Sequence, residues 1–156
     1  MANLEARFGL RAAQESDARL IKQMVRRAGI NPLGLHWPRF TVAVDERGQV
    51  IGCVQIKPHA TSVKELASLV VVRPWRSRGV GAALVEAVKA RSGGDLWLMC
   101  RGDLTPYYAR LGFEVISDFP LLDPAFRRYW QLGRLVSALT LGKARLAFMR
   151  WQAQSE

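Results

Sequence analysis

The sequence predicts an α/β protein in which helices cover a central sheet of about six to seven strands. Short apolar runs alternate along the chain with segments that repeat apolar residues at helical spacing. No internal repeat, low-complexity tract or linker divides the 156 residues, so we expect a single domain over 1–156. The hydrophobic fraction of 49% is enough for a sizeable core in a chain of this length.

The chain begins with a predicted strand and a helix. The strand lies in "ARFGLRAA", and Ser16 and Asp17 are candidate caps for the helix that follows. Gly29 marks the end of that helix. The apolar stripe of the helix is expected to consist of Leu20, Ile21, Met24, Val25 and Ala28.

A loop and three strands come next. "INPLGLHWPRF" contains two prolines and predicts a loop with one short helical turn. "FTVAV" and "VIGCVQIKP" flank "DERGQ" and indicate a hairpin. "VKELASLVVV" is apolar on both faces toward its end, which is typical of a buried central strand.

The second half alternates helices and strands. Its first helix should bury a stripe made of Val80, Ala83, Leu84, Ala87 and Val88. Three elements follow that helix: a strand in "DLWLMC", a short helix in "TPYYARLGF" and a strand from "GFEVI". Asp123 followed by Pro124 signals a further helix, so an extended helical segment near 121–142 is expected before a last strand in "ARLAFMRW".

Charge and cysteine usage limit the class of protein. The chain carries 23 Lys and Arg against 13 Asp and Glu, a net charge of +10, which suggests an anionic partner. Cys53 and Cys100 form no CxxC motif and have no histidine pair nearby, so we expect neither a disulfide framework nor a metal site. The start lacks a signal-peptide core and no apolar run is long enough to cross a bilayer, so a cytoplasmic protein is expected.

The segment "RPWRSRGVG" lies where a buried strand gives way to a helix. Gly79 and Gly81 lack a Cβ, so a phosphate can approach the free amides of the helix start. Arg76 and Arg78 can add charge-assisted contacts. The pattern fits neither a Walker loop, which needs GK[ST], nor GxGxxG, which needs glycine at Leu84. We interpret the segment as a phosphate cradle; the alternative is a plain helix start with solvated arginines.

A second motif, "PYYARLGFE", follows the next buried strand in the same way. Together the two motifs resemble the signature segments of the GNAT acetyltransferase superfamily, over roughly residues 7–118. The pattern R/Q-x-x-G-x-G/A is matched by Arg76, Gly79 and Gly81. The pattern aromatic-Tyr-x-x-x-Gly-Phe is matched by Tyr107, Tyr108, Gly112 and Phe113.

The resemblance implies a mixed, mostly antiparallel sheet with helices on both faces, and acetyl-CoA as co-substrate without a metal. The pantetheine arm maps to the strand before the glycine turn, and the pyrophosphate to the turn itself. The cofactor-binding residues that it implies are Leu69, Val70, Val71, Arg76, Ser77, Arg78, Gly79, Val80, Gly81 and Ala82.

The resemblance also implies two catalytic residues. Glu65 matches an acidic position that many members have on this strand, where a carboxylate accepts the proton of the attacking amine. Strand alternation is expected to place it on one face with Ala67, Leu69 and Val71. Tyr108 matches the usual general acid, which protonates the departing thiolate. The alternatives are a solvated glutamate and a packing tyrosine.

The acceptor, a primary amine of a small molecule or peptide, is not specified by the sequence. In the family it is bound near "INPLGLHWPRF" and the segment after Ile116. The helix over 124–142 is most simply docked on the sheet; a homodimer contact and a membrane surface are left open for it. Two other functions remain: a non-catalytic acyl-CoA-binding module and, from charge alone, a nucleic-acid-binding protein, which lacks a recognition motif. His36 and His59 are given no role, and Cys100 is expected to pack in its strand.

Overall fold

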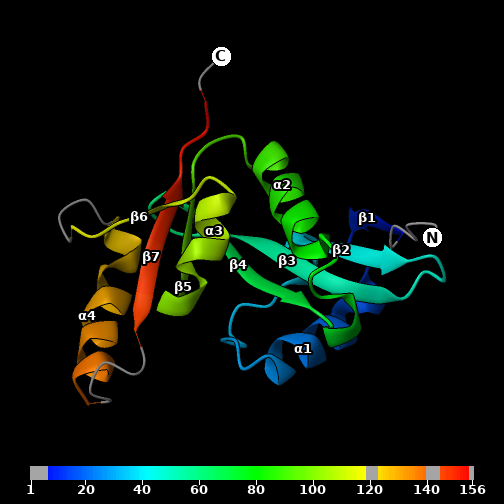
Figure 1. The fold of residues 1–156 in the computed structure, drawn as a ribbon, viewed down its shortest axis with the longest axis horizontal. Coiled ribbons are helices and arrows are strands. Elements are labelled where there is room, and N and C mark those ends of the chain that lie inside the picture. Colours follow the sequence, from blue (N-terminus) through cyan, green and yellow to red (C-terminus); the bar gives the residue numbers. More distant parts are fainter. Residues whose placement is uncertain (1–6, 119–122, 140–144, 155–156) are drawn as a thin grey trace. The chain divides into compact units, whose positions relative to one another are not determined.

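The structure is a computed structural model that describes residues 7–118, 123–139 and 145–154. Within these residues the strands are β1 (Phe8–Ala12), β2 (Phe40–Asp45), β3 (Val50–Pro58), β4 (Lys64–Val71), β5 (Leu96–Arg101), β6 (Glu114–Val115) and β7 (Leu146–Trp151). The helices are α1 (Ala18–Arg27), α2 (Val80–Ser92), α3 (Thr105–Arg110) and α4 (Pro124–Leu139) (Figure 1). Every element expected from the sequence is present, including a short 3₁₀ turn at Trp37–Arg39 in the predicted loop.

The strands form a seven-stranded mixed sheet in the order β1-β2-β3-β4-β5-β7-β6. β4 and β5 pair in parallel, whereas β1 with β2, β2 with β3, β5 with β7 and β6 with β7 run antiparallel. The predicted fold class is therefore confirmed. The chain divides into two compact units, Met1–Lys57 with Leu66–Arg91 and Pro58–Glu65 with Ser92–Glu156. The single domain over 1–156 stays a prediction.

In the first unit, β2 and β3 form the predicted hairpin. Asp45 closes its turn, because one carboxylate oxygen accepts hydrogen bonds from the amides of Arg47 and Gln49, both at 2.9 Å. Gly48 lies between them at φ 77°, a left-handed conformation that glycine adopts without steric cost. Local turn chemistry thus fixes which residues of the two strands face each other.

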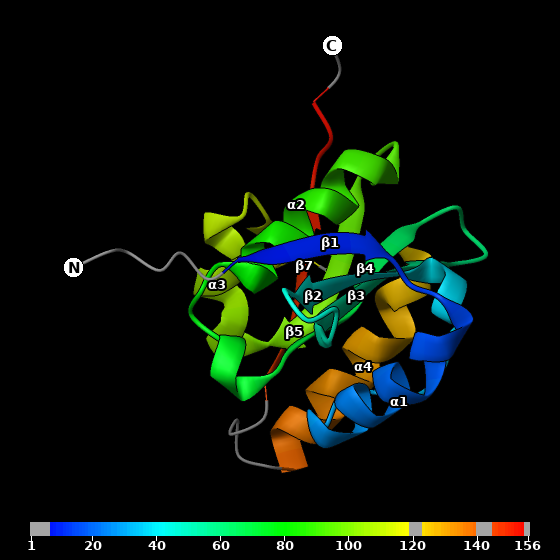
Figure 2. The same cartoon turned by 90° about the vertical axis from the view of Figure 1, so that its right-hand side faces the viewer.

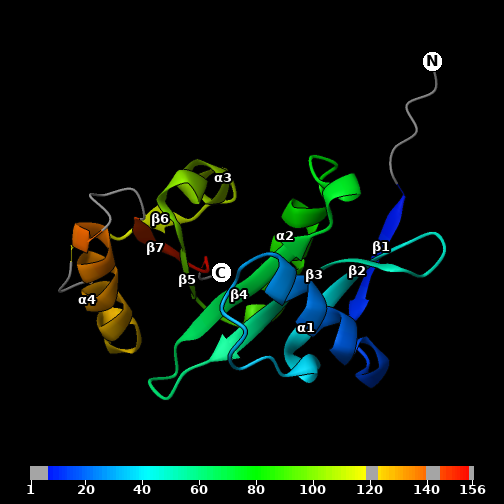
Figure 3. The ribbon, with the colours of Figure 1, turned by 90° about the horizontal axis from the view of Figure 1, so that it is seen from below.

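Two helices cover opposite faces of β3 in this unit (Figures 1 and 3). A Cβ on Gly52 would lie 3.1 Å from a methyl carbon of Leu84 and 3.3 Å from one of Val80, so this face of the strand is closed by α2. The next residue, Cys53, belongs to a cluster with Ile21, Met24 and Val25 of α1. Because successive side chains of a strand point to opposite faces, the two helices must lie on opposite sides.

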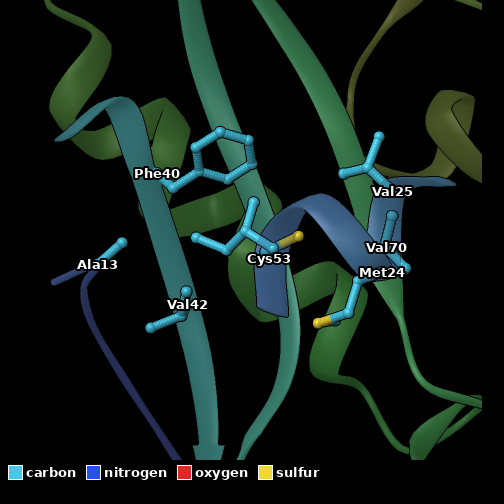
Figure 4. Packing of buried hydrophobic residues seen from close by; sticks show 8 residues of the cluster. Ala13, Met24, Val25, Phe40, Val42, Cys53 and Val70 are labelled. Atoms are coloured by element: carbon cyan, nitrogen blue, oxygen red, sulfur yellow. The ribbon is translucent and has the colours of Figure 1, made fainter. Parts of the chain in front are cut away.

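The cluster on the α1 face forms the core of the first unit. Figure 4 shows side chains from α1, β2, β3 and β4 converging there; its buried members are Ala13, Ile21, Met24, Val25, Phe40, Val42, Cys53 and Val70. The expected stripe of α1 is correct in its centre and wrong at its ends. Leu20 is exposed, and so is Ala28, which caps the helix C-terminus. The buried stripe is shorter along the helix than expected, because only the middle turns of α1 face the strands.

Of the two caps expected for α1, Asp17 occupies the N-cap position, but its side chain does not form a capping hydrogen bond. Asp17 ends a 3₁₀ turn before the helix and accepts hydrogen bonds from the Gln14 amide at 2.7 Å and from Arg11 at 2.7 and 3.1 Å. The Arg11 guanidinium holds the pKa of this buried carboxyl below its ordinary value. The carboxylate therefore fastens the start of the helix to β1 instead of capping it.

In the second unit, β5, β7 and β6 carry helices α3 and α4 (Figures 1 and 2). Phe126 of α4 is fully buried against Trp97 and Phe148, with ring centroids 5.9 and 6.1 Å apart. Val63 completes this cluster. Trp97 and Phe148 therefore point from β5 and β7 toward α4.

Helix α4 lies within the helical segment expected near 121–142. Residues 121, 122 and 140–142 of that segment lie outside the described residues. Its docking on the strands through Phe126 agrees with the simplest interpretation. Leu132 and Leu135, by contrast, are more than half exposed. Within the described ranges, no helix combines the length and apolar character needed to span a bilayer.

Candidate functional site

The glycine turn between β4 and α2 has the geometry of an open anion cradle. Ser77 and Gly79 adopt left-handed backbone conformations, with φ of 59° and 82°. The amide of Ala83 donates to the carbonyl of Gly79 at 3.0 Å, so the amides before Ala83 are those that the first helical turn leaves without partners. A Cβ on Gly79 would find no atom within 4 Å, which means that open space lies in front of this residue. The turn and the helix dipole together favour a negative charge there.

The guanidinium groups of Arg76 and Arg78 each make a contact with the protein. Nε of Arg76 donates to the carbonyl of Val71 at 2.9 Å, which ties the turn to the end of β4. The Arg78 guanidinium lies over the Trp75 ring, 5.3 Å from its centroid. Both residues are exposed, so their remaining N–H groups face solvent at the open side of the turn. The other residues predicted to bind cofactor continue the same stretch: Leu69, Val70 and Val71 at the end of β4, and Val80, Gly81 and Ala82 in the first turn of α2.

The strand before the turn is not regular, which corrects one expectation. Ser68, in the middle of β4, has φ 57°, and a non-glycine residue in this region interrupts the pleat. The burial of the strand alternates from Leu66 to Val71, with Ala67, Leu69 and Val71 half-buried, whereas Glu65 is buried and departs from the expected alternation. Ser68 is fixed by Gln55, whose amide nitrogen donates to the Ser68 hydroxyl at 3.1 Å.

Glu65, at the start of β4, lies in the second unit and is buried. Its carboxylate oxygen Oε2 is 2.6 Å from Nε2 of His59, and the two side chains are 8% and 16% exposed. The sequence analysis missed His59, because a lone histidine after a strand carries no signal of its own. The short connection from β3 to β4 was the available clue, since it returns the chain close to His59, whose amide donates to the Val63 carbonyl at 2.9 Å.

Tyr108 lies on α3 and is buried, with its ring edge-on to Tyr107 and Phe113 at centroid distances of 5.1 and 5.9 Å. Burial, followed by the nearby Cys100 and Tyr107, raises the pKa of its hydroxyl above the ordinary value for tyrosine. The hydroxyl makes no hydrogen bond to a residue that the structure describes, and it is not sealed from solvent. It is therefore a protonated donor without a partner in the described part of the chain.

Glu65 and Tyr108 of the second unit make no direct contact with each other. Across the described ranges, no hydrogen bond, ion pair or ring contact joins Glu65 to Tyr108. Cys100 is buried in β5 beside α3, as expected, and burial raises the pKa of its thiol to about 11. Three or more His, Cys, Asp or Glu side chains suited to a metal ion do not gather anywhere in the part of the chain that the structure describes.

A hollow of about 200 Å³ lies in the first unit between α1 and the loop before β2. Its lining residues are Ala18, Ile21, Lys22, Leu35, His36 and Trp37. The loop is the one predicted to bind the acceptor, and the hollow places a lysine ammonium and an imidazole in its wall. His36 is exposed there; its carbonyl accepts a hydrogen bond from the Arg39 amide at 3.0 Å, and its imidazole makes no hydrogen bond or ion pair with the described residues.

Comparison with known proteins agrees with these motifs. A mycothiol acetyltransferase of Mycobacterium sp. (strain JLS) is 28% identical over 141 residues, which cover 79% of this chain and 47% of that protein. The N-acetylglutamate synthase of Neisseria gonorrhoeae, solved with coenzyme A and N-acetyl-glutamate, superposes with a TM-score of 0.74 at 18% identity, over 96% of this chain and 36% of that one.

A third relative has nearly the same length as this chain. Rv2747 from Mycobacterium tuberculosis, solved in complex with CoA and NLQ, gives a TM-score of 0.71 at 22% identity over 94% of this chain and 99% of that one. The chain thus spans about half the length of the mycobacterial mycothiol acetyltransferase and nearly all of the length of Rv2747. At such identities the solved structures establish the fold alone.

The family model for the acetyltransferase (GNAT) domain matches residues 36–115, which include the hairpin, the glycine turn and the Tyr108 motif. This match covers half of the chain and both segments from which the resemblance was drawn. The chain belongs to the GNAT acetyltransferase family.

Proposed function

We propose that the chain is an acetyl-CoA-dependent N-acetyltransferase, which moves the acetyl group to a primary amine by direct attack in a ternary complex. The observation that carries this proposal is the turn from Arg76 to Ala82, with its left-handed Ser77 and Gly79 before the free amides of α2. An open space in front of Gly79 and two exposed guanidinium groups suit a pyrophosphate. The solved relatives that hold coenzyme A support the same assignment.

The cofactor-binding roles follow from this turn. The amides of Ser77 to Ala82 would donate to the pyrophosphate, with Arg76 and Arg78 adding charge. The backbone of Leu69, Val70 and Val71 would pair with the pantetheine arm. Ser68, directly before these residues, has a left-handed backbone conformation, so the strand departs there from a regular pleat.

The chemistry requires one proton to leave the amine and one to reach the sulfur. A primary ammonium with a pKa of about 10 must be deprotonated before it attacks, and Glu65 is the proposed base. Tyr108 is the proposed acid for the thiolate. Its raised pKa keeps the hydroxyl protonated at neutral pH, so that a proton is available there.

The hollow between α1 and the loop before β2 is the proposed acceptor site. Lys22 and His36 in its wall suit an acceptor that carries an acidic group besides its amine. The N-acetyl-glutamate bound by the synthase of Neisseria gonorrhoeae is a ligand of this kind. Amino acids and acidic peptide N-termini are therefore the first acceptors to test.

The test is a panel of amines, amino acids and peptide N-termini, incubated with acetyl-CoA while free thiol is followed. Thiol release that depends on one acceptor class, with a matching acetylated product by mass spectrometry, supports the proposal. In parallel, acetyl-CoA at a hundredfold excess over its Kd should stabilise the protein by about 2.7 kcal/mol. Binding without turnover on any acceptor would favour a non-catalytic acyl-CoA module. The absence of both responses would refute the proposal.

A further inference from the structure

His59 and Glu65 are held together by a short turn between β3 and β4. Nε2 of His59 lies 2.6 Å from Oε2 of Glu65. The turn closes on itself, since the His59 amide donates to the Val63 carbonyl at 2.9 Å and the Ser62 amide to the His59 carbonyl at 3.2 Å. The two side chains are nearly enclosed, at 16% and 8% exposure, so water competes little for this bond.

The imidazole is also fixed from outside the turn. Its ring packs on Phe126 of α4 at a centroid distance of 5.3 Å, and Phe126 stacks on Trp97 at 5.9 Å. Trp97 is the residue of β5 that pairs with Glu65 in register. The Thr61 hydroxyl donates to the Asp123 carboxylate at 3.0 Å, which joins the turn to the start of α4. The position of the imidazole is therefore set by the turn and by α4.

The two oxygens of Glu65 are in different situations. An ionised carboxylate only accepts hydrogen bonds, so Nε2 of His59 must carry the hydrogen when Glu65 is charged. Oε2 thus accepts the hydrogen bond from His59. Oε1 receives no hydrogen bond from any residue that the structure describes and is accessible to solvent. A single donor has fixed the group and left one oxygen available.

We propose that His59 is a positioning residue for Glu65: it holds Oε2 so that Oε1 takes the proton of the acceptor amine. This inference rests on the proposed transferase function. The protons balance as follows: the ammonium brings three, the amide keeps one, the thiolate receives one, and one passes to Oε1 and then to solvent. The N–C bond forms at the acetyl carbon as its C–S bond breaks.

The other charged groups on the packed elements are bonded elsewhere or follow Phe126 on α4. Lys64 donates to the Ser92 carbonyl, Asp123 accepts from Thr61, and Arg150 pairs with Asp95. Arg127 and Arg128 are the next residues of α4 after Phe126 and are exposed. Among the described residues, no other charged group is hydrogen-bonded to the pair formed by His59 and Glu65.

The first test compares His59→Gln and His59→Leu in the full chain, with the acceptor identified from the panel. Glutamine keeps an N–H donor and should retain kcat within about tenfold, whereas leucine removes it and should lose roughly 10- to 100-fold in kcat with the KM for acetyl-CoA unchanged. Thr61→Val is the matched control, because it loosens the same turn but keeps the Nε2 donor of His59; its kcat should fall much less than that of His59→Leu. A loss in Thr61→Val as large as that in His59→Leu would overturn the proposal.

A double variant separates positioning from mere packing. Glu65→Gln should lose about 10²–10⁴ in kcat, and adding His59→Leu to it should cost nothing more, because His59 acts through Glu65. Losses that multiply would overturn the inference. A loss of more than about tenfold in kcat of a folded His59→Gln protein would also overturn it, and this result decides the case if His59→Leu does not fold. A wild type that turns over while Glu65→Gln stays fully active refutes this inference and the role of Glu65 as base; a wild type without turnover refutes the proposed transferase function.

Discussion

Replacing Tyr108 by phenylalanine tests the proposed proton donor most directly. The substitution keeps the ring, whose edge contacts with Tyr107 and Phe113 at 5.1 and 5.9 Å hold it in place. The hydroxyl that it removes makes no hydrogen bond to a residue that the structure describes. No bond within the described protein is lost, so the free energy of unfolding at pH 7 should change by less than about 1 kcal/mol.

The effect on turnover should be much larger than the effect on stability. General acid catalysis contributes on the order of 10²–10⁴ in rate, which corresponds to about 3–5 kcal/mol in activation free energy. We therefore expect kcat to fall by that factor in Tyr108→Phe while the Kd for acetyl-CoA stays within about twofold. A thiol leaving group of lower pKa should lose less, because it needs less protonation.

The assay is thiol release with the identified acceptor, together with thermal denaturation and calorimetric titration of acetyl-CoA. Tyr107→Phe is the matched control: it removes a hydroxyl from the neighbouring, half-buried ring and should keep kcat near that of the wild type. A folded Tyr108→Phe protein with full kcat would refute the reasoning and leave Tyr108 as a packing residue. Equal losses in both variants would show that Tyr108 is not distinguished from Tyr107 as the proton donor.

Three other substitutions, one of them with a matched control, test the turn and the buried titrating groups. Gly79→Ala should cost roughly 1–2 kcal/mol of stability, because Gly79 has φ 82°, and should raise the Kd for acetyl-CoA at least tenfold. Gly48→Ala is the control, since Gly48 has φ 77° and equally open space at its Cβ. This control should cost the same stability and leave that Kd unchanged, as calorimetry will measure. Burial raises the pKa of the Cys100 thiol from 9.0 to about 11. The contribution of the neutral thiol to stability is therefore present below pH 9 and lost as the pH rises through 11. Between these pH values the free energy of unfolding, measured by chemical denaturation, should fall by about 1–3 kcal/mol less in Cys100→Ala than in the wild type. Arg11 lowers the pKa of Asp17 from 3.8. The contribution of the ionised carboxylate to stability is therefore present above pH 3.8 and lost as the pH falls through the lower pKa of the folded state. Asp17→Asn should lower the free energy of unfolding by about 1–3 kcal/mol at pH 7, and the urea midpoints of this variant and the wild type should approach each other in acid.

Local patterns were sufficient for most of the fold. The strands and helices follow from apolar periodicity, and the hairpin at Gly48 follows from turn chemistry that involves neighbours in sequence. Periodicity located α1 but overestimated its buried stripe, because Leu20 and Ala28 have the right spacing and lie beyond the part of the helix that faces the strands. How far an apolar face is covered depends on the partner element, which the sequence of the helix does not contain.

The candidate site divides in the same way. The sequence alone determined the glycine turn and the Tyr108 motif, because the amides of a helix start, a missing Cβ and a ring on one helix are properties of consecutive residues. The tertiary structure decided that Ser68 interrupts β4 and that His59 holds Glu65 at 2.6 Å. These depend on the closure of a turn and on Phe126, some sixty residues further along the chain, packing on the imidazole. Contacts between distant residues form only when burial of apolar surface brings them together, and no local pattern records them.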